Sequence, residues 1–129
     1  MAAQMHEGSC HCGSVRVRVE ADISQLTRCT CSMCTKKGML GFYVPVHQFH
    51  LLQGESELLL YQFNARVTKH FFCRRCGIHV FMNPRSDPSA FAVHARCLDN
   101  LDLDAARYEV KLFDNRNWEA AQEARLRDG

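Results

Sequence analysis

The chain has 129 residues, of which 47% are hydrophobic and 23% are charged, which is an ordinary composition for a globular protein. This length suits one domain over residues 1–129 and gives no sign of a disordered tail. The formal net charge of +2 counts every thiol as neutral, so it does not indicate a nucleic-acid partner, and no apolar stretch is long enough to span a bilayer.

The first predicted strands lie in the N-terminal third. Residues 15–20 (VRVRVE) alternate apolar and charged side chains, which predicts a half-buried strand with Val15, Val17 and Val19 facing inward. Residues 42–46 (FYVPV) are rich in strand formers. Because Pro45 lacks a backbone N–H, we expect this strand at the edge of a sheet.

The rest of the chain predicts further short strands and one helix. The predicted elements are a strand pair at 57–63 and 67–72 with a turn at 64–66, a strand at 77–83 ended by Pro84, a loop at 84–89, strands at 91–97 and 107–113, and a short helix at 117–128 capped by Asn117. Short strands at regular spacing indicate a mostly β fold with little helix.

Eight cysteines form three groups and a single residue. The groups are 10–13 (CHCG), 29–34 (CTCSMC) and 73–77 (CRRCG), and Cys97 stands apart. The N-terminus shows no secretory leader, so we expect a cytoplasmic, reducing location, where disulfides are rare. A redox C-x-x-C normally begins a helix in a βαβ unit, which this sequence does not predict. The clustering therefore favours metal binding over both alternatives.

Four of these cysteines suit a closed structural zinc site. On an extended chain, Cys10 and Cys12 point to one face, and the turn of a C-x-x-C motif lets Cys73 and Cys76 converge on one ion. Gly77 follows where such a turn often needs a positive φ. Neither pair fills a tetrahedral site alone, so we expect the two pairs to share one zinc ion.

Cys29, Cys31 and Cys34 supply three thiolates from what we expect to be one loop, and we call them the tripod. Closed zinc sites support folds, whereas a site with three protein ligands can accept a substrate. Three thiolates make zinc a weak Lewis acid that suits a soft ligand, such as the thiol of a substrate. The alternatives are that Cys97 or a histidine such as His94 closes this site, or that the tripod holds no metal.

Several polar residues are candidates to handle a proton beside the tripod. These are His94, Arg96, His79 and Tyr43, and the sequence does not choose a general base among them. The pairs at 36–37 (KK) and 74–75 (RR) are expected to be solvated loop charges.

The segments at 8–16 (GSCHCGSVR), 28–37 (RCTCSMCTKK) and 72–79 (FCRRCGIH) resemble the CENP-V/GFA domain family, which includes glutathione-dependent formaldehyde-activating enzymes and centromere protein V. PRS at 84–86 and RCLD at 96–99 extend the resemblance, which covers a core of about 8–118.

The resemblance implies twisted antiparallel sheets of the zinc-bound GFA-like (β-tent) type. It implies two zinc ions per chain, a structural one on Cys10, Cys12, Cys73 and Cys76, and a catalytic one on Cys29, Cys31 and Cys34. It also implies a carbon–sulfur lyase that uses glutathione as co-substrate and forms or breaks down S-hydroxymethylglutathione. The oligomeric state is left open.

Two other functions are compatible with the same cysteines. The first is a non-catalytic zinc module, related to centromere protein V, that binds a protein through exposed Phe and Met side chains at 39–43. The second is a redox or metal-buffering protein with labile thiols.

Overall fold

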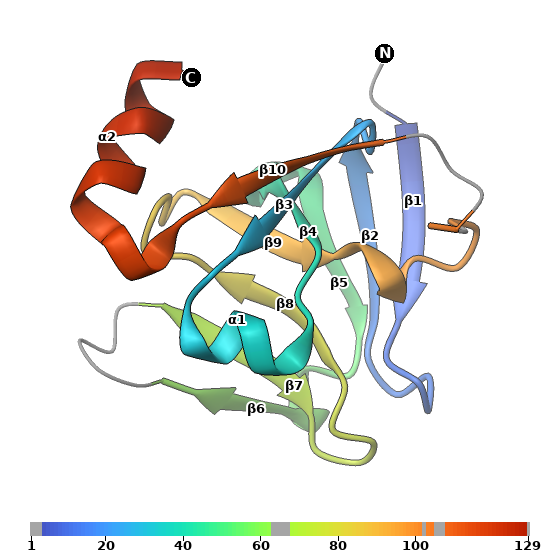
Figure 1. Cartoon of the computed structure of the whole chain (residues 1–129). Coiled ribbons are helices and arrows are strands. Elements are labelled where there is room, and N and C mark those ends of the chain that lie inside the picture. The colour runs from blue at the N-terminus through green and yellow to red at the C-terminus, as the bar shows by residue number, and fades with distance from the viewer. Residues whose placement is uncertain (1–3, 63–67, 102, 105–107, 129) are drawn as a thin grey trace.

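The computed structural model describes residues 4–62, 68–101, 103–104 and 108–128. These residues form two β-sheets, so the predicted mostly β fold is confirmed (Figure 1). The three-stranded sheet has the order β1–β2–β5, with β1 at Gln4–Ser9, β2 at Arg16–Ala21 and β5 at Phe49–Gln53. The seven-stranded sheet has the order β10–β3–β4–β9–β8–β7–β6, with β3 at Gln25–Cys29, β4 at Gly41–Pro45, β6 at Leu58–Tyr61, β7 at Lys69–Cys73, β8 at His79–Asn83, β9 at Ala90–His94 and β10 at Glu109–Phe113.

The strand pairs are antiparallel with one exception. β10 runs parallel to β3, in register from Glu109 opposite Gln25 to Phe113 opposite Cys29. A parallel pair needs a long connection, and the chain between β3 and β10 supplies one. The expectation of antiparallel sheets is therefore correct for every pair of described strands except this one.

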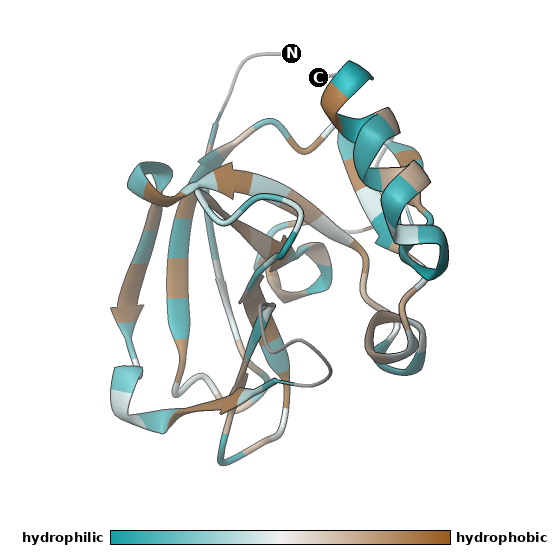
Figure 2. Ribbon diagram, turned by 90° about the vertical axis from the view of Figure 1, so that its left-hand side faces the viewer, coloured by the Kyte–Doolittle hydropathy of each residue, from teal (hydrophilic) through white to brown (hydrophobic). Residues whose placement is uncertain are grey.

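Two helices accompany the sheets. The predicted C-terminal helix is present as α2, which spans Trp118–Asp128 and projects to one side of the sheets (Figures 1 and 2). The shorter helix α1, at Ser32–Lys37, lies within the segment that we expected to be a loop. Four 3₁₀ turns complete the elements: η1 at Val46–Gln48, η2 at Glu55–Glu57, η3 at Ala95–Cys97 and η4 at Asn115–Asn117.

The core lies between the two sheets. Val15, Val17 and Val19 are fully buried, as the alternation of residues 15–20 predicts. They belong to one hydrophobic cluster with side chains of the larger sheet, such as Leu26 and Val93. Figure 2 shows the alternation of hydrophobic and hydrophilic residues along the strands. Burial of these apolar faces is the main force that joins the sheets.

Two strand predictions need correction. β4 lies between β3 and β9 and is not an edge strand. Pro45 is tolerated because β3 pairs with β4 only at Gly41, so the end of β4 needs no N–H on that side. The strand predicted at 91–97 ends at His94, where η3 begins.

The predicted cap Asn117 is the last residue of η4, directly before α2, and the remaining element predictions agree with the structure where it describes them. β6 and β7 form the predicted antiparallel pair, and β8 ends before Pro84. The turn predicted at 64–66 lies outside the described residues. No described helix is both long and apolar enough to cross a membrane.

Candidate metal centres

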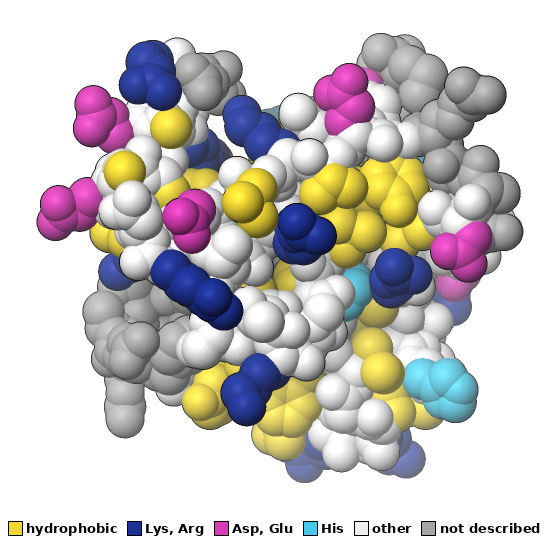
Figure 3. Space-filling view, in the orientation of Figure 1, with side chains coloured by type: hydrophobic (Ala, Val, Ile, Leu, Met, Phe, Trp, Pro, Cys, Tyr) yellow, Lys and Arg dark blue, Asp and Glu magenta, His cyan; other side chains and the backbone are white. Residues whose placement is uncertain are grey.

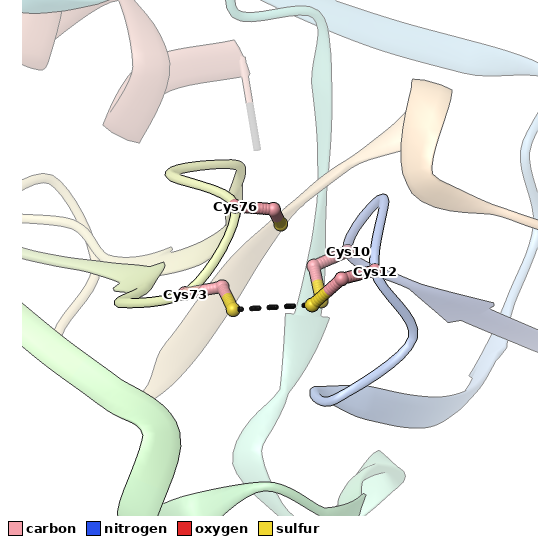
Figure 4. Close-up of side chains that lie close together, drawn as sticks. All are labelled: Cys10, Cys12, Cys73 and Cys76. Carbon is pink, nitrogen blue, oxygen red and sulfur yellow. Dashed lines mark hydrogen bonds between the residues drawn. The ribbon is translucent and has the colours of Figure 1, made fainter.

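The first centre joins the two sheets. Cys10 and Cys12 lie in the turn between β1 and β2, whereas Cys73 ends β7 and Cys76 lies in the turn that leads to β8. The four Sγ atoms all lie within 4.8 Å of one another (Figure 4). The Sγ of Cys12 is 3.6 Å from that of Cys10 and 3.7 Å from that of Cys73. The structure therefore brings together the four residues that the sequence pairs.

This arrangement fits a zinc ion. Tetrahedral coordination with Zn–S bonds of about 2.3 Å separates neighbouring sulfurs by about 3.8 Å, close to the separations seen here. The backbone N–H groups of Val15 and Arg75 donate to the sulfurs of Cys10 and Cys73, each at 3.3 Å. Such bonds stabilise the negative charge of ligating sulfur. Gly77 has φ +76°, the conformation expected after the C-x-x-C turn.

The second centre is the tripod. Cys29 is the last residue of β3, Cys31 caps the N-terminus of α1, and Cys34 lies inside α1. Their sulfurs also lie within 4.8 Å of one another. The ligands therefore come from a junction between a strand and a helix, and the prediction of a single loop is wrong.

The local sequence explains why a helix forms there. The Cys31 sulfur accepts a hydrogen bond from the N–H of Cys34 at 3.2 Å, as a capping side chain does. Gly38 ends the helix in the left-handed conformation with φ +67°. Lys36 and Lys37 lie in the last turn, where positive charge is favourable. These contacts hold the sulfur atoms of Cys31 and Cys34 close together.

Among the three tripod cysteines, Cys31 loses its proton most easily. Hydrogen bonds from Cys29 and Cys34 lower the pKa of Cys31 to about 2, and interaction with its two neighbours raises the pKa of Cys34. Cys31 is therefore the first thiolate of the group. A cation would favour ionisation of all three, because thiolates are the form that binds metal.

Neither Cys97 nor His94 completes the tripod. Within the described part of the chain, no further His, Cys, Asp or Glu ligand atom joins the three sulfurs. The Sγ of Cys97 contacts the carbonyl oxygen of His79 at 3.7 Å. Burial, with the nearby thiols of Cys10 and Cys76, raises the pKa of Cys97 to about 12. Cys97 thus lies nearer the four-cysteine centre and stays a thiol.

The tripod lines a small cavity of about 50 Å³, which we call the tripod cavity. Tyr43, His70, Arg85, Ser86 and Trp118 are among its other lining residues. The hydroxyl groups of Tyr43 and Ser86 are 3.1 Å apart, and burial raises the pKa of Tyr43. A neutral phenol therefore stands beside the three sulfurs.

Lys37 corrects the prediction that residues 36–37 are solvated. Lys36 is exposed, but the Nζ of Lys37 lies 2.8 Å from Nδ1 of His70 and 3.3 Å from Nε2 of His79. Burial lowers the pKa of Lys37 to about 8. Arg74 and Arg75 are exposed as predicted, and the guanidinium of Arg75 pairs with Glu57 at 3.1 Å.

His70 is a site residue that the sequence reasoning missed. It is 1% exposed, lines the tripod cavity and contacts Lys37. Burial, followed by the charge of Lys37, lowers its pKa to about 4. A histidine inside a strand that leads directly to Cys73 was the signal that could have identified it.

The four predicted proton-handling residues divide between two cavities. Tyr43 lines the tripod cavity. His79, His94 and Arg96 line a second cavity of about 730 Å³, which we call the basic cavity, and Arg96 also lines a cavity of about 460 Å³ that Cys29 and Cys34 border. Lys37 separates the two, because it contacts His70 on one side and His79 on the other.

Comparison with known proteins identifies the family. Residues 5–116 match the family described as "Glutathione-dependent formaldehyde-activating enzyme". A crystal structure of a Rhodobacter sphaeroides protein, solved as a structural-genomics target, is similar with a TM-score of 0.74 and 32% sequence identity. That similarity covers 81% of this chain and 99% of the other. With the two cysteine centres in place, the match over most of the chain shows that this protein belongs to the family of glutathione-dependent formaldehyde-activating enzymes.

Proposed function

We propose that this protein is a zinc-dependent enzyme of the carbon–sulfur lyase type, which acts on glutathione or a related thiol adduct. The observation that carries the proposal is the tripod, in which three sulfurs converge and no fourth described side chain joins them. A zinc site with three protein ligands can take a ligand from solution, whereas four cysteines close a site. We assign the structural ion to Cys10, Cys12, Cys73 and Cys76, and the catalytic ion to the tripod.

The proposed reaction joins a thiol to an aldehyde. The substrate sulfur forms a bond to the carbonyl carbon of formaldehyde, the C=O double bond becomes a single bond, and the oxygen takes up a proton. The thiol loses one proton, so the addition is balanced without an oxidant or reductant. When bound, zinc would supply the positive charge that keeps a substrate thiol ionised. Breakdown of S-hydroxymethylglutathione is the same sequence in reverse.

Tyr43 is suited to protonate the aldehyde oxygen. Tyr43 lines the tripod cavity, and burial keeps its hydroxyl group in the neutral, proton-donating form. Ser86, 3.1 Å away, holds the orientation of this hydroxyl. The small size of the tripod cavity suits a sulfur atom and a one-carbon aldehyde.

The protein-binding alternative lacks the surface that it requires. Met39 and Phe42 are each 3% exposed, so the predicted contact patch at 39–43 is buried. The three sulfurs instead face a cavity with polar side chains, which favours an enzyme. The metal-buffering alternative is opposed by the backbone N–H bonds to Cys10, Cys31 and Cys73, which favour firmly held metal.

Cobalt substitution tests whether the tripod binds a thiol. We expect the chain to take up two Co²⁺ ions and glutathione to change the visible spectrum of one of them. Cys34→Ser should remove that response. A spectrum of two four-sulfur sites that glutathione does not alter would contradict the proposal.

Formaldehyde consumption in the presence of glutathione tests catalysis. Tyr43→Phe should reduce the rate about a hundredfold, the usual scale of general acid catalysis, and leave the cobalt response to glutathione intact. Tyr61→Phe is the control, because Tyr61 is 46% exposed and lines neither of the cavities that Cys29 and Cys34 border. Equal rates for the wild-type and Tyr43→Phe proteins would exclude this role.

A further inference from the structure

The basic cavity combines positive charge with an apolar wall. Lys37 of α1, His79 of β8 and Arg96 of η3 line it, together with apolar side chains such as Met33 and Ile78. In the view of Figure 3, Lys and Arg side chains stand close to histidine and hydrophobic surface on the face that carries α1. Its volume of about 730 Å³ is within the usual range for small-molecule sites.

The cavity holds cations that lack a carboxylate partner. Among the described residues, no Asp or Glu lines it, and neither Lys37 nor Arg96 forms an ion pair with a carboxylate. Lys37 is half-buried, so its charge is only partly screened by water. The tripod sulfurs are the negative groups that act on Lys37, so an anion that enters this cavity would meet positive charge that no carboxylate neutralises.

Lys37 also fixes the tautomers of the two histidines that it contacts. An ammonium group has three donors and no acceptor, so Nδ1 of His70 and Nε2 of His79 must accept from Nζ. Burial lowers the pKa of His79 to about 2, so its ring is neutral. The proton of the neutral His79 ring is then on Nδ1, which makes that nitrogen a hydrogen-bond donor.

Two buried nitrogens at this cavity have no hydrogen-bond partner within the described part of the chain. They are Nδ1 of His79 and Nδ1 of His94, whose residues are 8% and 9% exposed. The main-chain carbonyls of Phe81 and Leu40 interact with these rings and raise the pKa values of His79 and His94 slightly, but no bond to Nδ1 reaches full hydrogen-bond geometry. The two rings therefore stand at the wall of the cavity with incompletely satisfied nitrogens, which makes them sensitive reporters of a ligand that enters it.

We propose that the basic cavity is a binding site for the carboxylate of an acidic small molecule. The carboxylate would accept hydrogen bonds from Nζ of Lys37, which has a third donor beyond those facing His70 and His79, and Arg96 would add charge at the exposed side. The hydrocarbon part of the ligand would lie against Met33 and Ile78. The tripod sulfurs do not line this cavity, so the inference does not rest on the proposed reaction.

The carboxylate can belong to the thiol substrate or to a separate acid, and three probes separate these two sources. Glutarate has carboxylates and no thiol, S-methylglutathione has carboxylates and a blocked sulfur, and cysteamine has a thiol and no carboxylate. Each is titrated into the zinc-loaded chain while the ring nitrogens of His79 and His94 are followed by ¹H–¹⁵N NMR. We expect glutarate and S-methylglutathione, but not cysteamine, to shift these signals with saturation.

Substitutions then show which side chains bind the carboxylate. Lys37→Met and Arg96→Gln should each weaken binding of the two carboxylate probes about tenfold, which is the loss of one charge-assisted contact. Lys36→Met, an exposed lysine of the same helix, should leave binding unchanged. Carboxylate probes that leave the His79 and His94 signals unmoved, or shifts that persist equally in Lys37→Met and Arg96→Gln, would overturn the proposal.

The two sources of the carboxylate give different results. If the cavity holds part of the thiol substrate, S-methylglutathione should bind about tenfold or more tightly than glutarate. If it holds a separate acid, the two probes should bind alike, and glutarate should not displace glutathione from the cobalt-loaded tripod. Cysteamine reports on the tripod alone through the cobalt spectrum, so failure of the proposed enzyme and failure of this site are distinguishable.

Discussion

Lys37 carries a positive charge into a half-buried position between the rings of His70 and His79. Its Nζ contacts both rings, and its charge lowers the pKa of each, second only to burial. Lys37→Met should therefore raise both pKa values, because the repulsion disappears while the burial remains. NMR titration of the ring protons measures this change, with Lys36→Met as the control. Unchanged histidine pKa values would show that burial alone sets them.

His94 should make the stability of the fold depend on pH. Burial, with the charges of Lys37 and Arg96, lowers its pKa to about 4, whereas an unfolded imidazole has a pKa of about 6.5. As the pH falls from 6.5 to 4, the unfolded chain binds this proton and the folded chain does not. Stability should therefore fall in that window, by at most about 1.4 kcal/mol per pH unit for one group.

Replacement of His94 isolates this effect. His94→Phe removes the titrating group and should flatten the fall in unfolding free energy between pH 6.5 and 4, measured by urea unfolding of the zinc-loaded chain. His47→Phe is the control, because His47 is exposed. Loss of zinc at low pH affects both variants, so the difference between the two curves reports His94. Parallel curves would contradict the assignment.

At the scale of elements, α2 is attached to the loop that borders the tripod cavity. The amide of Gln122 donates to the carbonyl of Ser86 at 3.0 Å, and Arg125 pairs with Asp87 at 3.0 Å. The Arg85 guanidinium lies 3.4 Å from the centre of the Trp118 ring. The helix therefore supports the side of the cavity that carries Ser86 and, through it, the Tyr43 hydroxyl.

Trp118→Ala should loosen this support. We expect a loss of about 1–3 kcal/mol in unfolding free energy, less than for a fully buried Trp because Trp118 is only half-buried. The rate of formaldehyde consumption should fall as well, because Ser86 and Tyr43 lose their fixed positions. Leu126→Ala is the control on the same helix, since Leu126 is 67% exposed. Equal activity of the two variants would separate α2 from the site.

Strands could be predicted where the local alternation of apolar and polar residues matches the burial of their side chains. Alternation at residues 15–20 is sufficient to place Val15, Val17 and Val19 in the core. Pro45 misled the prediction because sheet order depends on contacts with distant strands, and these are not visible in a local pattern. Helix α1 was missed because its cap is a cysteine sulfur, which sequence rules do not include among N-caps.

The grouping of cysteines was predictable from ligand counting, but their surroundings were not. The spacing of the motifs pairs Cys10 and Cys12 with Cys73 and Cys76, and tetrahedral geometry leaves little choice. The contacts of Lys37 with His70 and His79 connect residues 33 and 42 positions apart. The sequence contains no local signal for such contacts, so the separation of the tripod cavity from the basic cavity appeared only in the structure.

At the scale of the whole molecule, the two centres should contribute unequally to stability. The four-cysteine centre joins the β1–β2 turn of one sheet to the β7–β8 turn of the other. The tripod joins only β3 to the adjacent α1. With the proposed zinc ion in the first centre, the free energy of metal binding would also be folding free energy, which reaches about 10–16 kcal/mol in small zinc domains. The second centre adds little that the hydrophobic core does not already provide.

A matched pair of substitutions tests this difference. Cys73→Ser should remove the structural ion and unfold much of the chain, seen as loss of NMR signal dispersion. Cys34→Ser should release one zinc ion of two, measured by native mass spectrometry, and leave the far-ultraviolet circular dichroism unchanged. Cys97→Ser, a cysteine outside both centres, should retain both ions. Equal damage from Cys73→Ser and Cys34→Ser would mean that both ions hold the fold together, and the tripod would then have no freedom to exchange a ligand.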